Sequence, residues 1–129
     1  MDKQQTFEYN RYADIKRLLF IEQELKEKVK PGGRVLDFGC GNGIISRHLG
    51  KKGYRVTGID VDAKAIDVAK GLNKSELVDF QVGSPQGLQF PSDTFDAIIC
   101  SEVIEHLTQP ESLLLTLNKV LKPDGVLVV

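Results

Sequence analysis

The spacing of apolar residues changes several times along this chain, and each change marks an expected element. The first element is an amphipathic helix over residues 11–29, where apolar side chains recur at helical spacing. The side chains expected near its buried face are Ile15, Leu18, Leu19, Leu25 and Val29. Pro31 and Gly32 follow directly and predict where this helix ends.

Short apolar runs of strand length then alternate with further helical patterns. Strands are predicted over residues 35–38, 54–59, 77–82, 95–101 and 126–129. Helices are predicted over residues 42–52, 63–72 and 110–121, with a loop over 83–93 and a turn over 122–125. Strands that alternate with helices predict an α/β fold, a doubly wound, Rossmann-like parallel sheet with helices on both faces.

The most informative stretch is residues 35–43, which reads Val-Leu-Asp-Phe-Gly-Cys-Gly-Asn-Gly. An apolar strand, three alternating glycines and a helix in that order predict a corner that binds a nucleotide or nucleoside. Glycine permits positive φ in the turn and lets the backbone come close to a ligand. We also expect free N–H groups at the helix start to point into this corner.

The spacing of this motif departs from a dinucleotide fingerprint. Gly39 and Gly41 fit that fingerprint, but Ile44 occupies the place of its third glycine, which disfavours a nicotinamide-dependent dehydrogenase. The carboxylate of Asp37 would repel a pyrophosphate. Asp60, about 20 residues beyond the first glycine, is placed to bind ribose hydroxyls. Together these residues predict a ligand with a ribose, a positive charge and no phosphate.

The motif at 35–43, followed by Gly58-Ile59-Asp60, resembles the class I S-adenosylmethionine-dependent methyltransferases, of the methyltransferase type 11/12 and ubiquinone-biosynthesis-like group. The resemblance extends from about Tyr9 to Val129. It implies S-adenosylmethionine as cofactor, S-adenosylhomocysteine as product, and in-line methyl transfer to a small-molecule acceptor. The family sheet has seven strands, so the five predicted here imply one domain, 1–129, truncated at its C-terminus. That domain would comprise an N-terminal helical segment, 1–30, and a cofactor-binding core, 31–129.

The resemblance also implies a set of cofactor-binding residues. Asp37 would organise the glycine loop near the methionine end of the cofactor, and Tyr12 or Tyr9 would close over it unless these rings pack the helix onto the sheet. Ser84 or Gln86 would bind adenine, where many relatives have an acid. Asp60 would bind ribose unless it caps the next helix. The full set is Tyr12, Asp37, Gly39, Cys40, Gly41, Asn42, Asp60, Val61, Ser84, Gln86 and Ser101.

The segment after the fourth strand carries the candidate catalytic residues. Glu105 and His106 are candidate acid–base groups, since the pKa of histidine suits that role. With Glu102 they also lie at i, i+3 and i+4, a spacing that resembles the metal site of small-RNA 3′-terminal 2′-O-methyltransferases. That metal-assisted activity is an alternative, but the main prediction is a site without metal. The other histidine, His48, is expected to be a plain surface residue of its helix.

Composition narrows the class of protein. The chain has 129 residues and a formal net charge of −1, so no overall field favours nucleic acid. Its apolar runs are too short to span a bilayer, and its polar start predicts a cytoplasmic protein. Cys40 and Cys100 have neither disulfide-framework nor metal-site spacing. The apolar strand at 126–129 is expected at a sheet edge, where a homodimer can form. A further alternative is a module that binds S-adenosylmethionine without activity.

Overall fold

We analysed a computed structural model of the chain, which describes residues 3–100 and 110–129, with side chains over 13–100 and 111–129. All five expected strands and four expected helices are present. In chain order the elements are α1 (Lys3–Lys28), β1 (Arg34–Phe38), α2 (Ile44–Lys51), β2 (Arg55–Asp60), α3 (Ala63–Leu72), β3 (Val78–Val82), the 3-10 helix η1 (Pro85–Gly87), β4 (Phe95–Ile99), α4 (Pro110–Val120) and β5 (Leu121–Val128).

The strands form one parallel sheet with the order β3-β2-β1-β4-β5. The chain therefore moves outward in one direction from β1 to β3 and then reverses to reach β4. In sheets of this type the ligand crevice lies outside the carboxyl ends of the strands, at the point of reversal. Here that point is between β1 and β4, directly beside the glycine loop. The predicted fold class is confirmed.

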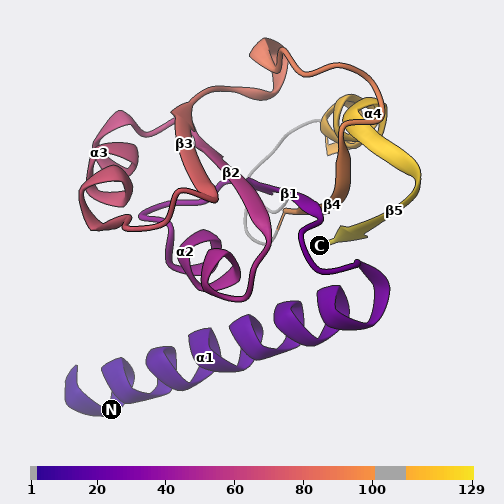
Figure 1. The fold of residues 1–129 in the computed structure, drawn as a ribbon. Helices are drawn as coiled ribbons and strands as arrows, with labels where there is room; N and C mark the ends of the chain where they lie inside the picture. Colours follow the sequence, from indigo (N-terminus) through magenta and orange to yellow (C-terminus); the bar gives the residue numbers. More distant parts are fainter. Residues whose placement is uncertain (1–2, 101–109) are drawn as a thin grey trace.

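Helices cover both faces of the sheet, because the side chains of β1 alternate between two cores. Val35 packs in a core with Leu25 of α1 and Leu49 of α2. Its neighbour Leu36 points the other way, into a core with Leu117 of α4. Figure 1 shows α2 and α3 side by side on one side of the sheet, with α4 on the other side near β5.

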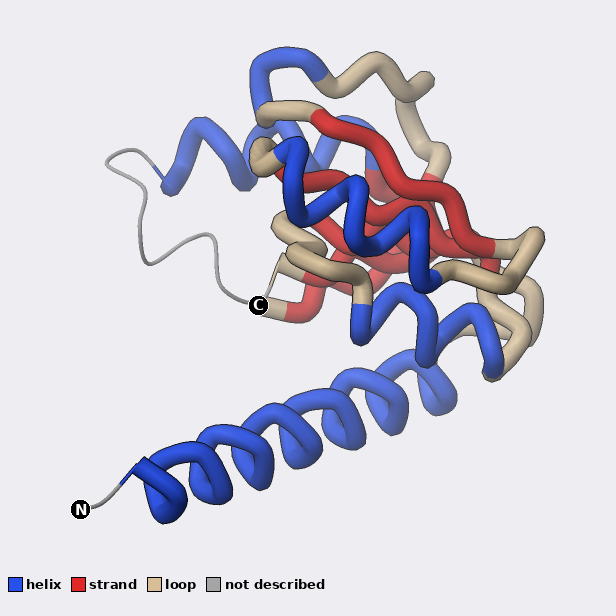
Figure 2. The backbone as a smooth tube through the Cα atoms, turned by 90° about the vertical axis from the view of Figure 1, so that its left-hand side faces the viewer, coloured by secondary structure: helices blue, strands red, loops and turns tan. Residues whose placement is uncertain are grey.

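The buried face of α1 differs from the one expected. Ile21, Leu25 and Val29 are buried, whereas Ile15 and Leu19, both expected to be buried, are 47% and 55% exposed. The helix also begins well before residue 11, at Lys3. Its N-terminal half extends past the sheet, as Figures 1 and 2 show, so only the C-terminal half has a sheet to cover. The prediction of the buried face was therefore wrong at Ile15, in the half that extends past the sheet, and also at Leu19, which is exposed although it lies in the C-terminal half.

The expected turn at 122–125 lies inside β5. Phe95 pairs with Leu121 and Ala97 pairs with Val126, so the four residues between 121 and 126 lie opposite Asp96 alone. The chain bulges there, as Pro123 and the following glycine favour. Nζ of Lys122 donates to Oδ1 of Asp96 at 2.9 Å and fastens the bulge to β4.

His48 is not the plain surface residue expected. Its Nε2 lies 3.1 Å from Oε2 of Glu22 in α1, and both side chains are partly buried. Nζ of Lys52 is 3.5 Å from the other carboxylate oxygen of Glu22. These contacts join α1 to α2, and thereby hold α1 beside the glycine loop that precedes α2.

Candidate functional site

The glycine loop is bound to the carboxyl end of β2 through its own backbone. The N–H groups of Gly39 and Cys40 donate to the carbonyl of Ile59 at 2.7 and 3.0 Å. The N–H of Gly41 donates to Oδ2 of Asp60 at 2.8 Å. The N–H groups at the start of α2, which were expected to face a ligand, are not among these three, and their role stays a prediction. The amides of Gly39, Cys40 and Gly41 face protein acceptors instead. Because protein acceptors already occupy them, the loop is a poor cradle for phosphate, as the departure from the dinucleotide fingerprint predicts.

Two glycines of the loop adopt conformations that other residues avoid. Gly41 has φ +56° and Gly43 has φ +84°, both in the left-handed region. A Cβ at Gly43 would also lie 2.5 Å from Cζ of Phe80, well inside van der Waals contact. Gly43 therefore allows α2 to start directly against β3, and a side chain there would push the two apart.

Asp60 and Asp62 have separate roles at the end of β2. Oδ1 of Asp62 accepts the N–H groups of Lys64 and Ala65, which makes Asp62 the N-cap of α3. Asp60 instead uses Oδ1 to accept the N–H of Asp62 at 2.9 Å and Oδ2 to accept that of Gly41. The alternative in which Asp60 is the helix cap is thus wrong, and its carboxylate is held between loop and helix.

Asp37 is buried at the end of β1, with 2% of its surface exposed. Oγ of Ser46 in α2 donates to its Oδ2 at 2.7 Å. Burial raises the pKa of Asp37 to about 6, and the negative charge of Asp60 adds to that rise. A cation beside Asp37 would offset this cost and favour the ionised carboxylate.

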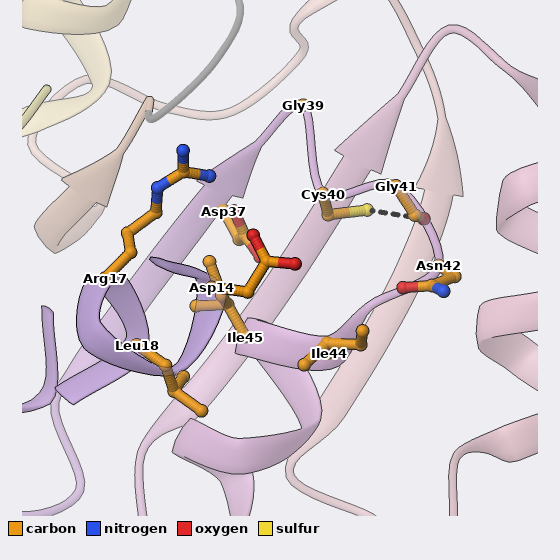
Figure 3. Close-up of a pocket in the computed structure, with 10 residues that line it drawn as sticks. All are labelled: Asp14, Arg17, Leu18, Asp37, Gly39, Cys40, Gly41, Asn42, Ile44 and Ile45. Carbon is orange, nitrogen blue, oxygen red and sulfur yellow. Dashed lines mark hydrogen bonds between the residues drawn. The ribbon is translucent and has the colours of Figure 1, made fainter. Parts of the chain in front are cut away.

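A cavity of about 200 Å³ opens between the glycine loop and α1. Figure 3 shows its lining residues, with Asp14 pointing from α1 toward Asp37 and with Arg17 and Leu18 extending from the same helix. The residues that line it are Asp14, Arg17, Leu18, Asp37, Gly39, Cys40, Gly41, Asn42, Ile44 and Ile45. Five of these were predicted from sequence: Asp37, Gly39, Cys40, Gly41 and Asn42.

The contribution of α1 to this cavity was not predicted from sequence. Asp14, Arg17 and Leu18 lie at i, i+3 and i+4, so they share one face of the helix. The spacing of these three residues can be seen in the sequence, but no local pattern indicates that this face of the helix contacts the glycine loop. Together with Asp37, the helix gives the cavity two carboxylates and one guanidinium, a set suited to a ligand that carries both signs of charge.

The predicted adenine side lies along the same edge of the sheet. The N–H of Gly83 donates to the carbonyl of Asp60 at 3.0 Å, which brings the end of β3 beside the end of β2. Val61 and Val82 are 68% and 55% exposed there, and Ser84 begins η1. None of these residues, nor Gln86, lines the 200 Å³ cavity. Their contact with a cofactor stays a prediction.

The two cysteines are free thiols. Burial, with smaller contributions from Asp37 and Asp60, raises the pKa of Cys40 to about 12, and burial raises that of Cys100 to about 11. Cys40 therefore stays protonated, and its Sγ donates to the carbonyl of Gly41 at 3.6 Å. Its place in the loop suits backbone contact with a ligand rather than nucleophilic chemistry.

Several predicted residues lie outside what the structure describes. Ser101, Glu102, Glu105 and His106 fall in the segment 101–109, and the side chain of Tyr12 falls in the first part of α1. The metal alternative is therefore not tested at its own residues. Within the described ranges, no group of three or more His, Cys, Asp or Glu side chains could hold a metal ion. No described helix is long and apolar enough to cross a membrane.

Comparison with known proteins agrees with this geometry. The family described as "Methyltransferase domain" matches residues 36–129. The mitochondrial ubiquinone biosynthesis O-methyltransferase of Schizosaccharomyces pombe is 38% identical over 118 residues, which cover 87% of this chain and 43% of that protein. The chain thus spans less than half the length of this curated relative.

Several solved structures share the fold of this chain. PH0226 from Pyrococcus horikoshii matches with a TM-score of 0.75 and 34% identity, covering 85% of this chain and 54% of that one. PKMT2 from Rickettsia typhi, solved in complex with AdoHcy, matches with a TM-score of 0.68 and 27% identity, covering 74% of this chain and 20% of that one. The [4+2]-cyclase SpnF matches with a TM-score of 0.72 and 28% identity, covering 83% of this chain and 42% of that one.

Fold and site together define a Rossmann-like domain whose glycine loop and following acid are built for a nucleoside-containing ligand. The family match covers most of the chain and includes the glycine loop and Asp60. The chain belongs to the methyltransferase domain family.

Proposed function

We propose that this chain binds S-adenosylmethionine and is the cofactor-binding part of a methyltransferase acting on a small-molecule acceptor. The observation that carries the proposal is the bond between Gly41 and Asp60. This bond uses a loop amide that a phosphate ligand would need, and it fixes the acid that we expect to bind ribose hydroxyls. The same arrangement argues against dinucleotides and for a nucleoside without phosphate.

The residues present fit this cofactor by charge as well as by place. Its amino-acid end carries an ammonium and a carboxylate, and its sulfonium is a second cation. Asp14 and Asp37 offer carboxylates for the cations and Arg17 offers a guanidinium for the carboxylate, all lining one cavity. Asp60 would hold the ribose. Val61 and Val82, exposed beside it, would pack against the adenine.

S-adenosylmethionine supplies, when bound, a methyl group on a positively charged sulfur. The chain's own part is to orient donor and acceptor and to exclude water from between them. Such orientation can supply about 7–11 kcal/mol of a barrier without any catalytic base. A hydroxyl acceptor has a proton to lose, and His106 with Glu105 are the residues we propose to remove it.

We further propose a hydroxyl-bearing small molecule as the acceptor. The support is the likeness to the ubiquinone biosynthesis O-methyltransferase of S. pombe. Since that protein is much longer than this chain, acceptor specificity is part of the proposal. No observation favours the RNA alternative, because its metal-binding residues lie outside the described ranges.

Methyl transfer can be tested with S-adenosylmethionine labelled in its methyl group and a panel of small hydroxyl compounds. We expect label in at least one compound, dependent on the chain and reduced by Asp60→Asn. Cofactor binding with no transfer to any compound would instead support the module without activity. The acceptor proposal would then be wrong, and the cofactor proposal would stand.

The predicted homodimer also belongs among the proposals. β5 is a terminal strand of the described sheet and carries Leu127 at 38% exposure, and Val129, directly after the strand, is 66% exposed. An unpaired apolar edge of this kind favours strand pairing with a second copy. Sedimentation equilibrium of the chain and of a Leu127→Lys variant would test it, with a dimer expected only in the first. The cytoplasmic location stays a prediction.

A further inference from the structure

A second cavity lies at the opposite edge of the sheet from the glycine loop. It occupies about 500 Å³ between the end of α2 and the segment that follows α3. These two helices are neighbours on one side of the sheet (Figure 1). The residues that line the cavity are Arg47, Lys51, Leu72, Asn73, Lys74 and Ser75. Three of the six are cations, and none is an acid.

The wall formed by the segment after α3 is held by its own hydrogen bonds. Nδ2 of Asn73 donates to the carbonyls of Ser75 and Val78 at 3.2 and 2.9 Å, and its Oδ1 accepts the N–H of Ser75 at 3.1 Å. On the α2 side, Gly50 lets the two walls approach, because a Cβ there would overlap Val78. The cavity is therefore formed before any ligand arrives.

The charges of the three cations are not balanced by any ion pair in the part of the chain that the structure describes. Within the described ranges, neither Arg47 nor Lys51 nor Lys74 forms an ion pair. Nε of Arg47 is buried, and no hydrogen-bond acceptor reaches it in the part of the chain that the structure describes. A buried, unsatisfied donor on a charged group is costly unless a ligand or water completes it. The two acids nearest to Lys74 along the chain, Glu76 and Asp79, are exposed and outside the lining.

The cations of α2 are not explained by hydrogen bonds to the carbonyls at the end of that helix. Basic residues near a helix C-terminus often bind its last carbonyls. Here the carbonyl of Leu49 accepts the N–H groups of Lys52 and Tyr54, and that of Gly50 accepts the N–H of Gly53. Backbone donors therefore already bind these carbonyls, which leaves the charges of Arg47 and Lys51 for another partner.

We propose that this cavity binds a small anion carrying a phosphate or pyrophosphate group. A guanidinium can bind two phosphate oxygens at once, and the ammonium groups of Lys51 and Lys74 add point charges to the same lining. Its volume of about 500 Å³ accommodates a small anion. The site is separate from the glycine loop, so it does not depend on the function proposed above.

Calorimetric titration of the chain with inorganic pyrophosphate, at fixed ionic strength, tests the proposal. We expect saturable binding to one site, unchanged when S-adenosylhomocysteine is present. Vesicles containing phosphatidylglycerol form a parallel arm. Binding to the vesicles with no binding of pyrophosphate would overturn the small-anion assignment, as would no saturable binding in either arm.

Variants show whether the cavity is the site. Arg47→Gln and the double variant K51Q/K74Q are each expected to weaken pyrophosphate binding by about tenfold or more, because each removes charge-assisted bonds. The double variant changes only exposed side chains, so it keeps the test valid if Arg47→Gln does not fold. Lys64→Gln removes one charge from an exposed position on α3 and is the control. An equal loss in Lys64→Gln would contradict the proposal, because it would indicate general attraction to charge.

Discussion

The carboxylate of Asp60 accepts the backbone N–H of Gly41 at 2.8 Å, joining the end of β2 to the glycine loop across 19 residues of sequence. The same carboxylate also accepts the N–H of Asp62 at the start of α3. One side chain thereby fixes the loop, the strand end and the next helix relative to one another. This contact holds the proposed cofactor site in shape before the cofactor binds.

The close approach of α2 to β3 depends on Gly43. Gly43→Ala places a Cβ at positive φ and against Phe80. We expect a loss on the order of 2–4 kcal/mol in the free energy of unfolding, from backbone strain and overpacking together. Urea unfolding measures it. Gly71→Ala in α3 is the control, since its Cβ meets open space, and it should stabilise by about 0.5–1 kcal/mol. Equal effects of the two changes would contradict this account.

Asp37 should make stability depend on pH. Its pKa is raised from 3.8 to about 6, so the folded chain holds this proton more tightly than the unfolded chain does. The contribution to the free energy of unfolding is complete below pH 3.8 and is lost as pH rises through about 6. The whole effect is on the order of 3 kcal/mol.

Asp37→Asn removes that titration and keeps a partner for Ser46. Urea unfolding at about pH 4.5 and about pH 7.5 should show a gap between wild type and variant that moves in favour of the variant at the higher pH. Taking the difference between the two proteins cancels the other acids. Parallel pH profiles would show that Asp37 does not titrate in this range.

The buried face that Ile21 and Leu25 of α1 form with Val29 should carry most of the stability that this segment adds. Leu25 is fully buried and Leu19 is 55% exposed. Leu25→Ala is expected to cost about 2–5 kcal/mol, as cavities in a core do, whereas Leu19→Ala should stay within about 0.5 kcal/mol. Thermal or urea unfolding separates the two. Similar losses of stability in the two variants would instead support the buried face of α1 that was expected from sequence, which includes Leu19.

The contact of α1 with α2 depends on Glu22. The hydrogen bond to His48, followed by the charges of His48 and Lys52, lowers the pKa of Glu22 despite its partial burial. A lowered pKa adds stability above the ordinary value of 4.5, and that stability is lost as pH falls below it. Glu22→Gln should speed hydrogen exchange in α1 by a few-fold, or about 0.5–1 kcal/mol.

The matched control for that change is Glu24→Gln, which breaks an exposed pair with Lys28 inside the same helix. It should leave exchange in α1 nearly unchanged, because pairs of this kind contribute only about 0.3–0.5 kcal/mol. If both variants exchange alike, the contact between the helices contributes nothing specific.

The fold could be predicted from sequence because its information is local. The spacing of apolar residues and the positions of glycine predict each strand and helix of the core. The alternation of strands and helices predicts a parallel sheet. The glycine loop and Asp60 were predicted for the same reason, since a known spacing separates them. The bulge at 122–125 was expected as a turn, because its proline and glycine are visible but the strand across from it is not.

What the sequence left out depends on contacts between distant segments. Asp14 and Arg17 join the site only because α1 crosses beside the glycine loop. The use of loop amides by Ile59 and Asp60 is likewise a tertiary fact. Periodicity placed Ile15 on a buried face without showing that the sheet ends before it. In each case the missing information is which surface a helix or loop meets.

The central claim is that the glycine loop and Asp60 bind S-adenosylmethionine and not a dinucleotide. Calorimetric titration with S-adenosylhomocysteine, with NAD in parallel, tests it most directly. We expect a Kd in roughly the micromolar range for the first and no binding of the second. Asp60→Asn should weaken binding by about tenfold or more, since a hydrogen bond to a charged group is lost. Asp67→Asn, an exposed acid on α3, should have no effect. Binding of NAD, or an affinity for S-adenosylhomocysteine unchanged in Asp60→Asn, would contradict the account.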